Sequence, residues 1–206
     1  MNKRVTDLNL VFSTPLWTSV ISNYKEINKK MLNYINNLRM NNPKGTFKSN
    51  ILGWHSENFN LNDDEPKFFI NSLGSTINEL FNDMGWDLIK NESKVTGMWS
   101  IINPTSASNA RHIHANNFIS AVYYINAPTK CGDILFYDPR SANVIRKPIT
   151  SGPNNINAQV VNITPKEGLL VLFPSYIHHS VEMNNSNEKV NCTIFYLVYF
   201  TISSCR

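Results

Sequence analysis

The chain has few cysteines, and this scarcity excludes two classes of small protein. Three cysteines occur in 206 residues, at Cys131, Cys192 and Cys205, and no two of them form a Cys-x-x-Cys pair. An odd, widely spaced set of this kind is not typical of a disulfide-stapled fold or of a cysteine zinc site. We therefore expect a protein of the reducing cytoplasm, which is the host cytoplasm if the source is viral.

Long hydrophobic runs and charge clusters are also absent. The basic start Met1–Arg4 is followed by a segment, 5–17, that polar residues and Pro15 interrupt, so it lacks the apolar stretch of a signal peptide. No run has the length needed to cross a membrane. The net charge of +4 comes from 19 basic and 15 acidic residues scattered along the chain. We expect no membrane partner and no nucleic-acid patch, and we leave room for a homodimer.

Hydrophobic periodicity predicts two helices in the first half of the chain. A capping-box-like Asn23–Glu26 precedes five apolar residues at helical spacing, which are Ile27, Met31, Tyr34, Ile35 and Leu38. A second apolar stripe begins after Pro66 and stops at Gly85, which predicts one helix with Gly74 inside it. The polar, turn-rich segment 41–60 between the helices is too elaborate for a simple linker.

From Val95 onward the pattern changes to short β-type runs separated by turn residues, and these runs are 95–102, 118–125, 133–137, 158–163, 168–173 and 190–202. A length of 206 residues with 42% hydrophobic content suits one domain over 1–206. We expect a mainly β fold with helices (α+β). In it, an N-terminal helical layer, about 1–94, covers a jelly roll of about eight strands, about 95–206.

Three histidines have the spacing of a metal site. His112-Ile113-His114 precedes a strand-like run, and His179 ends a second apolar run further along. Alternate residues of an extended segment project to the same side, so both histidines of the pair can bind one ion. An isolated His-x-His is more often a pair of surface histidines, but the third histidine changes those odds. A small antiparallel barrel can gather all three around one transition metal in its mouth.

Alternation around the third histidine distinguishes it from its neighbour. In an extended strand, one face presents Ile177, His179 and Val181, and the opposite face presents Tyr176, His178 and Ser180. His179 has the apolar neighbours, so it is the better candidate to point inward. Further along, Lys189 opens the final strand. It points into the barrel if the apolar face of that strand meets the helical layer, and the alternative is a solvent-facing lysine.

Taken together, these residues resemble the 2-oxoglutarate- and Fe(II)-dependent oxygenases, in particular a group of small, often phage-borne members. That group has a His-x-His before Ser-x-x-Tyr-Tyr and a basic residue before the last strand. The resemblance spans nearly the whole chain and rests on Phe12 to Trp17, Ser49 to Ser56, His112 to His114, Ser120 to Tyr124, Asp138-Pro139-Arg140, Phe173 to Val181 and Lys189.

The resemblance implies a double-stranded β-helix that uses Fe(II) and 2-oxoglutarate. It implies iron held by His112, His114 and His179, and the distal carboxylate of 2-oxoglutarate bound by Lys189. It also implies that the same pocket is lined by Tyr124, Asn126 and Arg140. The implied reaction uses O2 to hydroxylate an unknown prime substrate, small or macromolecular, with succinate and CO2 as co-products. No catalytic residue beyond the metal centre is implied.

The sequence departs from the wider superfamily at two positions. His114 stands where an aspartate or glutamate is usual, and Lys189 stands where an arginine is commoner. Loss of the carboxylate would leave the ferrous ion its full positive charge, which favours a dianionic co-substrate. Alternatively, Asp133 or Asp138 supplies the carboxylate from a neighbouring strand, although both follow the strand that contains Tyr124.

Two rival functions fit parts of the pattern. A cupin-type metal enzyme that does not use 2-oxoglutarate would share the histidines, but its glutamate soon after His-x-His is missing from Ala115 to Phe118. A non-catalytic jelly-roll binding module would contain the three histidines incidentally. Five residues are candidates for the rim that contacts the prime substrate: Asn103, Arg111, Asn116, Trp54 and His55. Polar loop residues near a site are, however, more often simply part of the loop.

Overall fold

Two antiparallel sheets and three helices make up the part of the chain that the computed structural model describes, residues 6–140 and 148–201. The helices are α1 (Tyr24–Asn41), α2 (Asp64–Ser72) and α3 (Gly74–Asp83). The strands are β1 (Trp17–Val20), β2 (Asn50–Ile51), β3 (Trp54–His55), β4 (Asn91–Asn103), β5 (Ser108–His112), β6 (Ile119–Asn126), β7 (Ile134–Tyr137), β8 (Val160–Ile163), β9 (Leu169–Pro174), β10 (His179–Val181) and β11 (Val190–Thr201). No helix in these ranges is long and apolar enough to cross a membrane.

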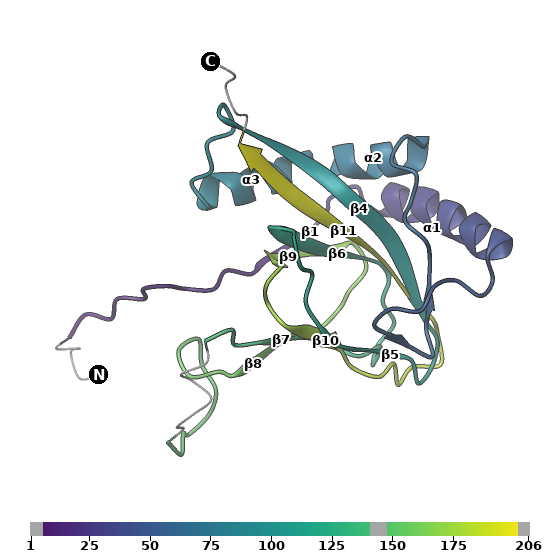
Figure 1. Cartoon of the computed structure of the whole chain (residues 1–206). Helices are drawn as coiled ribbons and strands as arrows, with labels where there is room; N and C mark the ends of the chain where they lie inside the picture. Colours follow the sequence, from purple (N-terminus) through teal and green to yellow (C-terminus); the bar gives the residue numbers. More distant parts are fainter. Residues whose placement is uncertain (1–5, 141–147, 202–206) are drawn as a thin grey trace.

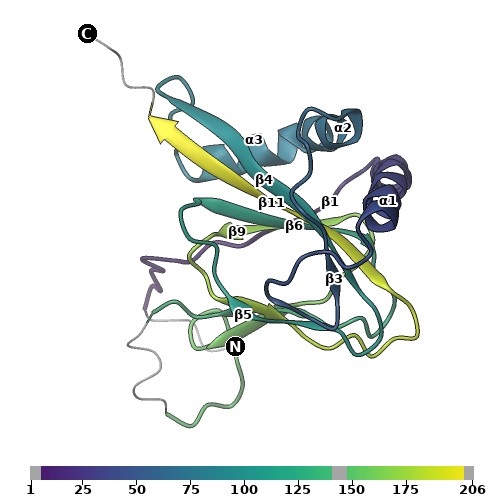
Figure 2. The same ribbon diagram turned by 45° about the vertical axis from the view of Figure 1, so that its right-hand side comes forward.

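The two sheets face each other, and the helices cover the outer face of the larger one (Figure 1). The larger sheet has six strands in the order β1-β9-β6-β11-β4-β3, and the smaller has five in the order β2-β5-β10-β7-β8. Figure 2 shows the helices and the smaller sheet on opposite sides of the larger sheet. The predicted mainly β fold with a helical layer is therefore confirmed.

The central strands β6 and β9 of the larger sheet are buried on both faces, and alternation assigns each side chain to one of them. Along β6, Tyr123 belongs to the core beneath the helices, whereas Tyr124 belongs to the core between the sheets. The same division holds along β9 for Leu170 and Val171. The helical side is closed by side chains of α1 that have no exposed surface, namely Ile27, Met31 and Ile35.

The first predicted helix is confirmed as α1, but Asn23 makes no side-chain capping bond. The second predicted helix is wrong in one respect, because the chain breaks at Leu73 into α2 and α3. Glycine has low helix propensity, so a break beside Gly74 costs little. Helix α3 ends where the sequence predicted, at Gly85, whose φ of +64° is that of a C-terminal helix cap.

The jelly roll of about eight strands expected over 95–206 corresponds to the eight strands β4 to β11, and three further strands, β1, β2 and β3, come from the segment before it. Strands β2, β3 and β10 are two or three residues long, too short for an alternating pattern to be recognised. Two of these short strands lie in the segment 41–60, where β2 pairs with β5 of the smaller sheet and β3 pairs with β4 of the larger one. This segment therefore joins the two sheets at one end of the space between them.

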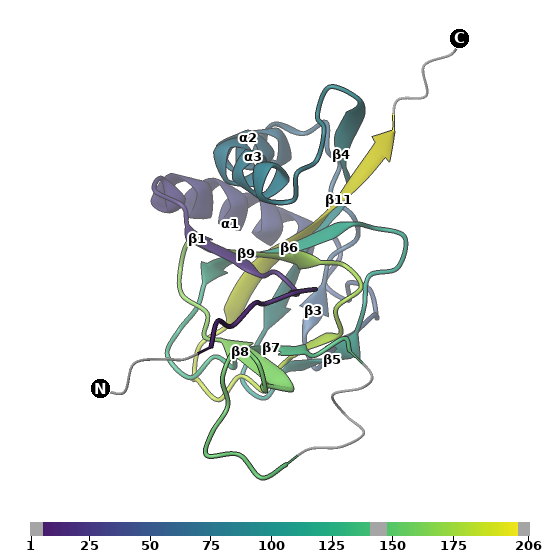
Figure 3. The ribbon, with the colours of Figure 1, turned by 90° about the vertical axis from the view of Figure 1, so that its left-hand side faces the viewer.

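An extended segment precedes the first strand. Figure 3 shows residues 6–16 running past β7 and β8 before the chain enters β1. Together with β7, β8 and the loops that follow β7 and precede β8, this segment lines a hollow of about 490 Å³, which we call the outer hollow. It is distinct from the cavity between the sheets.

Candidate metal centre

A cavity of about 640 Å³ lies between the two sheets. Its walls are largely apolar and come from the inner face of β4, β6 and β11 and from β5 and β10 opposite them. Among the described lining residues there is no aspartate or glutamate, and the cations are Lys48 and Arg111, both exposed. A concave, mostly apolar cavity with a few polar groups is the usual form of a small-molecule site.

The three predicted histidines meet in this cavity. His112 ends β5, His114 lies two residues beyond it, and His179 begins β10, where it pairs directly with His112. The ring centroids of His112 and His179 are 4.2 Å apart, and each is 4.8 Å from that of His114. Each ring can offer one nitrogen such that all three nitrogens lie within 4.8 Å of one another. This grouping can hold a metal ion.

Burial keeps the three imidazoles neutral. It lowers the pKa of His114 to about 2 and that of His179 to about 4, with neighbouring histidine charges adding to the effect. The pKa of His112 is also lowered, again mainly by burial. A neutral imidazole is the form that binds metals, so no proton has to leave these rings at neutral pH before an ion binds.

Two of the rings are oriented by the backbone two residues before them. His112 donates its Nδ1–H to the carbonyl oxygen of Ala110 at 2.7 Å, and His179 donates to that of Ile177 at 3.0 Å. A carbonyl oxygen can only accept, so both rings must have their hydrogen on Nδ1. The lone pair of each ring is then on Nε2. Metal-binding histidines are commonly fixed in this way by a bond at the second ring nitrogen.

The third ring has a different partner. Nδ1 of His114 lies 2.6 Å from the hydroxyl oxygen of Tyr196, a residue of β11 that also lines the cavity. A phenol hydroxyl can donate or accept, so this contact alone does not fix which nitrogen of His114 has the hydrogen. Tyr196 packs edge-on against Trp99, with 4.5 Å between ring centroids.

The neighbour of the third histidine lies on the other face, as alternation predicts. His179 is 4% exposed, whereas His178 is exposed to solvent. The alternative carboxylate ligands are not supported. Neither Asp133 nor Asp138 lines the cavity or belongs to the histidine group, and the carboxylate of Asp138 is instead bound by Arg140.

Tyr124 is the one predicted co-substrate residue that lines the cavity. Its side chain is 2% exposed, and its hydroxyl oxygen is buried with no hydrogen-bond partner among the described residues. A buried hydroxyl without a partner costs about 1–3 kcal/mol, so such groups in native proteins call for an explanation. A bound ligand with an acceptor atom at this position would supply the missing bond.

Of the two orientations considered for Lys189, the structure has the solvent-facing one. Lys189 is exposed and does not line the cavity. The prediction assumed that the apolar face of the last strand packs against the helices, whereas Val190, Cys192 and Ile194 belong to the core between the sheets. The opposite phase, which includes Phe195, packs under the helices. Alternation therefore directs Lys189 away from the metal group.

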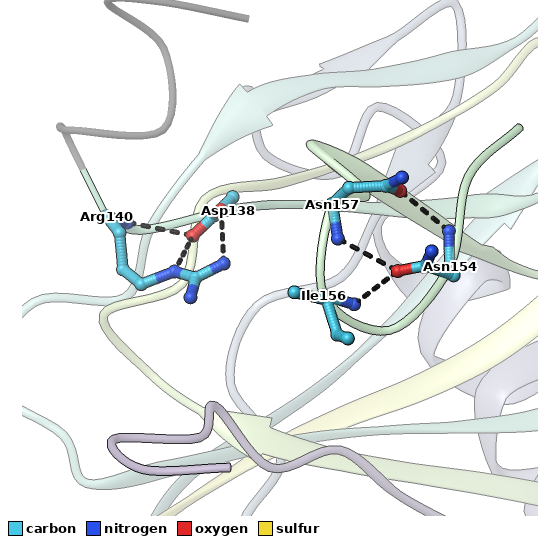
Figure 4. A network of polar contacts seen from close by, with 5 residues as sticks. All are labelled: Asp138, Arg140, Asn154, Ile156 and Asn157. Carbon is cyan, nitrogen blue, oxygen red and sulfur yellow. Dashed lines mark hydrogen bonds and ion pairs between the residues drawn. The ribbon is translucent and has the colours of Figure 1, made fainter. Parts of the chain in front are cut away.

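The other two predicted co-substrate residues also lie outside the cavity. Asn126 donates from its side-chain nitrogen to the carbonyl oxygen of Lys189 at 2.7 Å. Arg140 lines the outer hollow, where its guanidinium holds Asp138 through two bonds of 2.9 Å (Figure 4). Figure 4 also shows the nearby turn in which Asn154 accepts bonds from the backbone of Ile156 and Asn157. Resemblance alone had placed Asn126 and Arg140 in the pocket, and the structure corrects both placements.

The sequence named some residues that line the cavity only as candidates for the substrate rim, and it missed others. Of the candidate rim, Asn103, Arg111 and His55 line the cavity, whereas the side chain of Trp54 lies in the helix-side core and Asn116 is exposed elsewhere. Sequence reasoning missed Trp99 and Tyr196. An aromatic residue in the inward phase of a strand is the only signal that could have found them.

His55 is the fourth imidazole in the cavity. It stacks on Trp99 with 5.6 Å between ring centroids, and its Nδ1 lies 2.6 Å from the carbonyl oxygen of Ser56. Burial lowers its pKa, so the ring is neutral. It is not part of the three-histidine group.

Residues 97–195 match the family model described as "Putative 2OG-Fe(II) oxygenase". That range contains all three clustered histidines, and the fold around them is the double-stranded β-helix. The stretch 97–195 is therefore assigned to the 2-oxoglutarate- and Fe(II)-dependent oxygenases. The cofactors of this family are Fe(II) and 2-oxoglutarate, and O2 is its co-substrate. None of the curated proteins compared with this oxygenase matches its sequence.

Solved structures agree with the oxygenase fold. A prolyl-4-hydroxylase from Pseudomonas putida is 11% identical, with a TM-score of 0.59 over 90% of this chain and 92% of that one. HygX from Streptomyces hygroscopicus, with nickel and 2-oxoglutarate bound, is 8% identical, with a TM-score of 0.61 over 93% and 84%. A 2OG-Fe(II) oxygenase family oxidoreductase from Burkholderia pseudomallei is 12% identical, with a TM-score of 0.50 over 67% of this chain, which spans 58% of that protein.

Proposed function

We propose that this oxygenase hydroxylates an organic prime substrate and converts 2-oxoglutarate to succinate and CO2, with Fe(II) held by His112, His114 and His179. The observation that supports it most is the convergence of three neutral imidazoles in one cavity. Three side-chain ligands on one side of an ion leave open positions for a chelating keto acid and O2, as in other non-haem Fe(II) oxygenases.

The donor set fits this metal and this co-substrate. Three neutral imidazoles leave a ferrous ion its full 2+ charge, and 2-oxoglutarate is a dianion, so their attraction is stronger than in a site with a carboxylate ligand. The described lining residues include no acidic side chain that would oppose this attraction. The exposed cations Lys48 and Arg111 add positive charge at the cavity. Such charge steers an anion towards the site.

Tyr124 is the residue that we propose for the distal carboxylate of 2-oxoglutarate. Its hydroxyl is buried, lies in the wall of the cavity and has no partner among the described residues. A carboxylate oxygen would accept this hydrogen bond, and bonds to charged groups are stronger than neutral ones. Lys189, Asn126 and Arg140 have no part in this proposal, since none of them lines the cavity.

The protein's own contribution is orientation and exclusion of water. His112 and His179 are held on paired strands, and the apolar walls keep water from the reacting groups. When bound, Fe(II) and 2-oxoglutarate supply the oxidising chemistry: one oxygen atom of O2 enters succinate, CO2 leaves, and the other oxygen atom becomes the hydroxyl group of the prime substrate.

We also propose that the helices and both sheets form one domain and that the enzyme works in the cytoplasm. The core beneath the helices contains side chains from α1, α2 and α3 and from the larger sheet, so the helical layer and the sheet share one core. Cys131 and Cys192 are buried free thiols, which suits a reducing compartment, and Cys205 lies outside the described residues. The homodimer stays a prediction that sedimentation would test.

Turnover of 2-oxoglutarate tests the proposed function. Many such reactions can be followed without a prime substrate as slow, uncoupled succinate formation, which NMR detects directly. We expect succinate with Fe(II), O2 and the wild-type chain, and loss to background for His179→Ala. His178→Ala is the matched control, because that ring is exposed on the opposite face, and it should behave as wild type. Iron binding without 2-oxoglutarate binding or turnover would contradict the proposal and favour the cupin-type reading. Absence of metal binding would favour a jelly-roll binding module.

A further inference from the structure

We propose that Tyr196 is a positioning residue of the metal centre, which makes His114 a ligand by accepting its Nδ1–H. This inference rests on the proposed function and names a further residue of that same site. Its basis is the 2.6 Å contact between Nδ1 of His114 and the Tyr196 hydroxyl. His114 occupies the position at which the wider superfamily usually has a carboxylate, which needs no such partner.

A tautomer problem sets His114 apart from the other two histidines. His112 and His179 donate Nδ1–H to backbone carbonyls, so their Nε2 lone pairs are available. If the hydroxyl of Tyr196 donated to Nδ1 of His114, the ring hydrogen would be on Nε2 and that nitrogen could not bind an ion. If the ring donates to the hydroxyl instead, all three histidines present Nε2. Metal binding therefore requires Tyr196 to act as the acceptor.

The strand geometry supports a dedicated role for Tyr196. Its side chain is on the inward face of β11, in phase with Cys192 and Ile194, and it lines the cavity. The register of β11 against β4 shifts directly after this residue, between Tyr196 and Leu197. Bulges of this kind often lie next to active sites, where they re-aim a side chain.

The rings around Tyr196 hold it in place from two sides. Its centroid is 4.5 Å from that of Trp99 and 4.6 Å from that of His114. Trp99 in turn lies edge-on to His114 at 6.0 Å and stacks on His55. Close packing restricts how far the phenol can move from His114. In the acceptor role its own hydrogen is turned away from His114, and no acceptor for it is found among the described residues.

Nickel binding measured by calorimetry on the full chain tests this inference without turnover. We expect Tyr196→Phe to weaken Ni(II) binding by about 10–100-fold, the usual effect of removing a group that orients a ligand. Tyr137→Phe is the matched control, because its hydroxyl bonds to Ser180 and Tyr137 does not line the cavity. It should bind nickel as wild type does. Equal affinities for Tyr196→Phe and wild type would overturn the inference.

A double-mutant cycle separates an effect through His114 from a general loosening of the cavity. In a His114→Ala background, Tyr196→Phe should have no further effect on nickel affinity, because the ring that it orients is gone. The same loss in both backgrounds would overturn the inference.

The tautomers themselves can be observed by NMR of ¹⁵N-histidine-labelled protein with Zn(II). Beside the Nδ1–H signal of His55, whose Nδ1 faces the carbonyl oxygen of Ser56, we expect one from each of His112, His114 and His179 in the zinc-bound wild type. Tyr196→Phe should lose the His114 signal alone. Persistence of all three would overturn the role of Tyr196, and this outcome is decisive even if His114→Ala binds too weakly for the cycle. Failure of the wild type to bind any of these ions would instead contradict the proposed function together with this inference.

Discussion

Two neighbouring tyrosines of β6 show how differently the two faces of the larger sheet are used. Tyr123 faces the helices, and its hydroxyl donates to the side-chain oxygen of Asn28 in α1 at 2.7 Å. Tyr124 faces the cavity, and its hydroxyl is buried without a partner among the described residues. The Tyr123 hydroxyl is thus satisfied within the protein, as most buried polar groups are. The Tyr124 hydroxyl is the group that we propose for the distal carboxylate of 2-oxoglutarate.

The same contrast extends to the rings. On the helical face, Phe69 packs edge-on against Tyr123 and Phe195, with centroid separations of 5.2 and 5.8 Å. On the cavity face, Trp99 and Tyr196 line the cavity. The Trp99 ring lies edge-on to that of His114. A single set of strands thus provides stability on one side and chemistry on the other, and substitutions on the two sides should have separable effects.

The largest expected effect on stability comes from the helical face. Phe69 is fully buried, so Phe69→Ala should lower the free energy of unfolding by about 3–5 kcal/mol. Nickel affinity of the folded fraction should stay within about twofold of wild type, because Phe69 does not line the cavity. Urea denaturation followed by circular dichroism measures the first quantity. Phe47→Ala is the control, since Phe47 is 86% exposed and its loss should change stability by less than about 0.5 kcal/mol.

A crossed pair of substitutions on β6 sharpens the comparison at intermediate size. Tyr124→Phe should weaken 2-oxoglutarate binding by about tenfold or more, the loss of one hydrogen bond to a charged group, with little or no loss of stability. Tyr123→Phe should do the reverse: it should lower stability by about 1 kcal/mol and leave 2-oxoglutarate affinity unchanged. Equilibrium binding to the metal-loaded protein and thermal unfolding measure the two quantities. Equal behaviour of the two variants would break the distinction between the faces.

The smallest expected effect concerns the last strand. Lys189→Ala should leave 2-oxoglutarate affinity within about twofold of wild type, because Lys189 is exposed and outside the cavity. The resemblance implied the opposite, a loss comparable to that of a buried ion pair. A tenfold or larger loss in the same binding measurement would contradict the placement of the last strand described above.

The histidine group could be predicted from sequence because its signal is local. His112 and His114 are two residues apart, and apolar alternation around His179 identifies the residue that points inward. The jelly roll could be predicted for a similar reason, since its longer strands show runs of β-forming residues between turns.

The orientation of Lys189 could not be predicted, because β11 is buried on both faces. Apolar residues occur in both of its phases, with Val190, Cys192 and Ile194 towards the cavity and Phe195 towards the helices. The polar residues of the second phase, Asn191 and Thr193, are buried as well, so polarity does not reveal which side of the strand faces the cavity. The partner of His114 had to come from tertiary structure, because Tyr196 is separated from it by 82 positions.

Anaerobic titration of the metal-free protein with Fe(II) and then 2-oxoglutarate tests the central claim most directly. A keto acid that chelates ferrous iron gives a weak visible charge-transfer band. We predict that the band forms with wild type and His178→Ala, is absent with His179→Ala, and needs more 2-oxoglutarate with Tyr124→Phe. Failure of the band to form with a wild-type chain that has bound Fe(II) would contradict the assignment of this cavity to iron and 2-oxoglutarate.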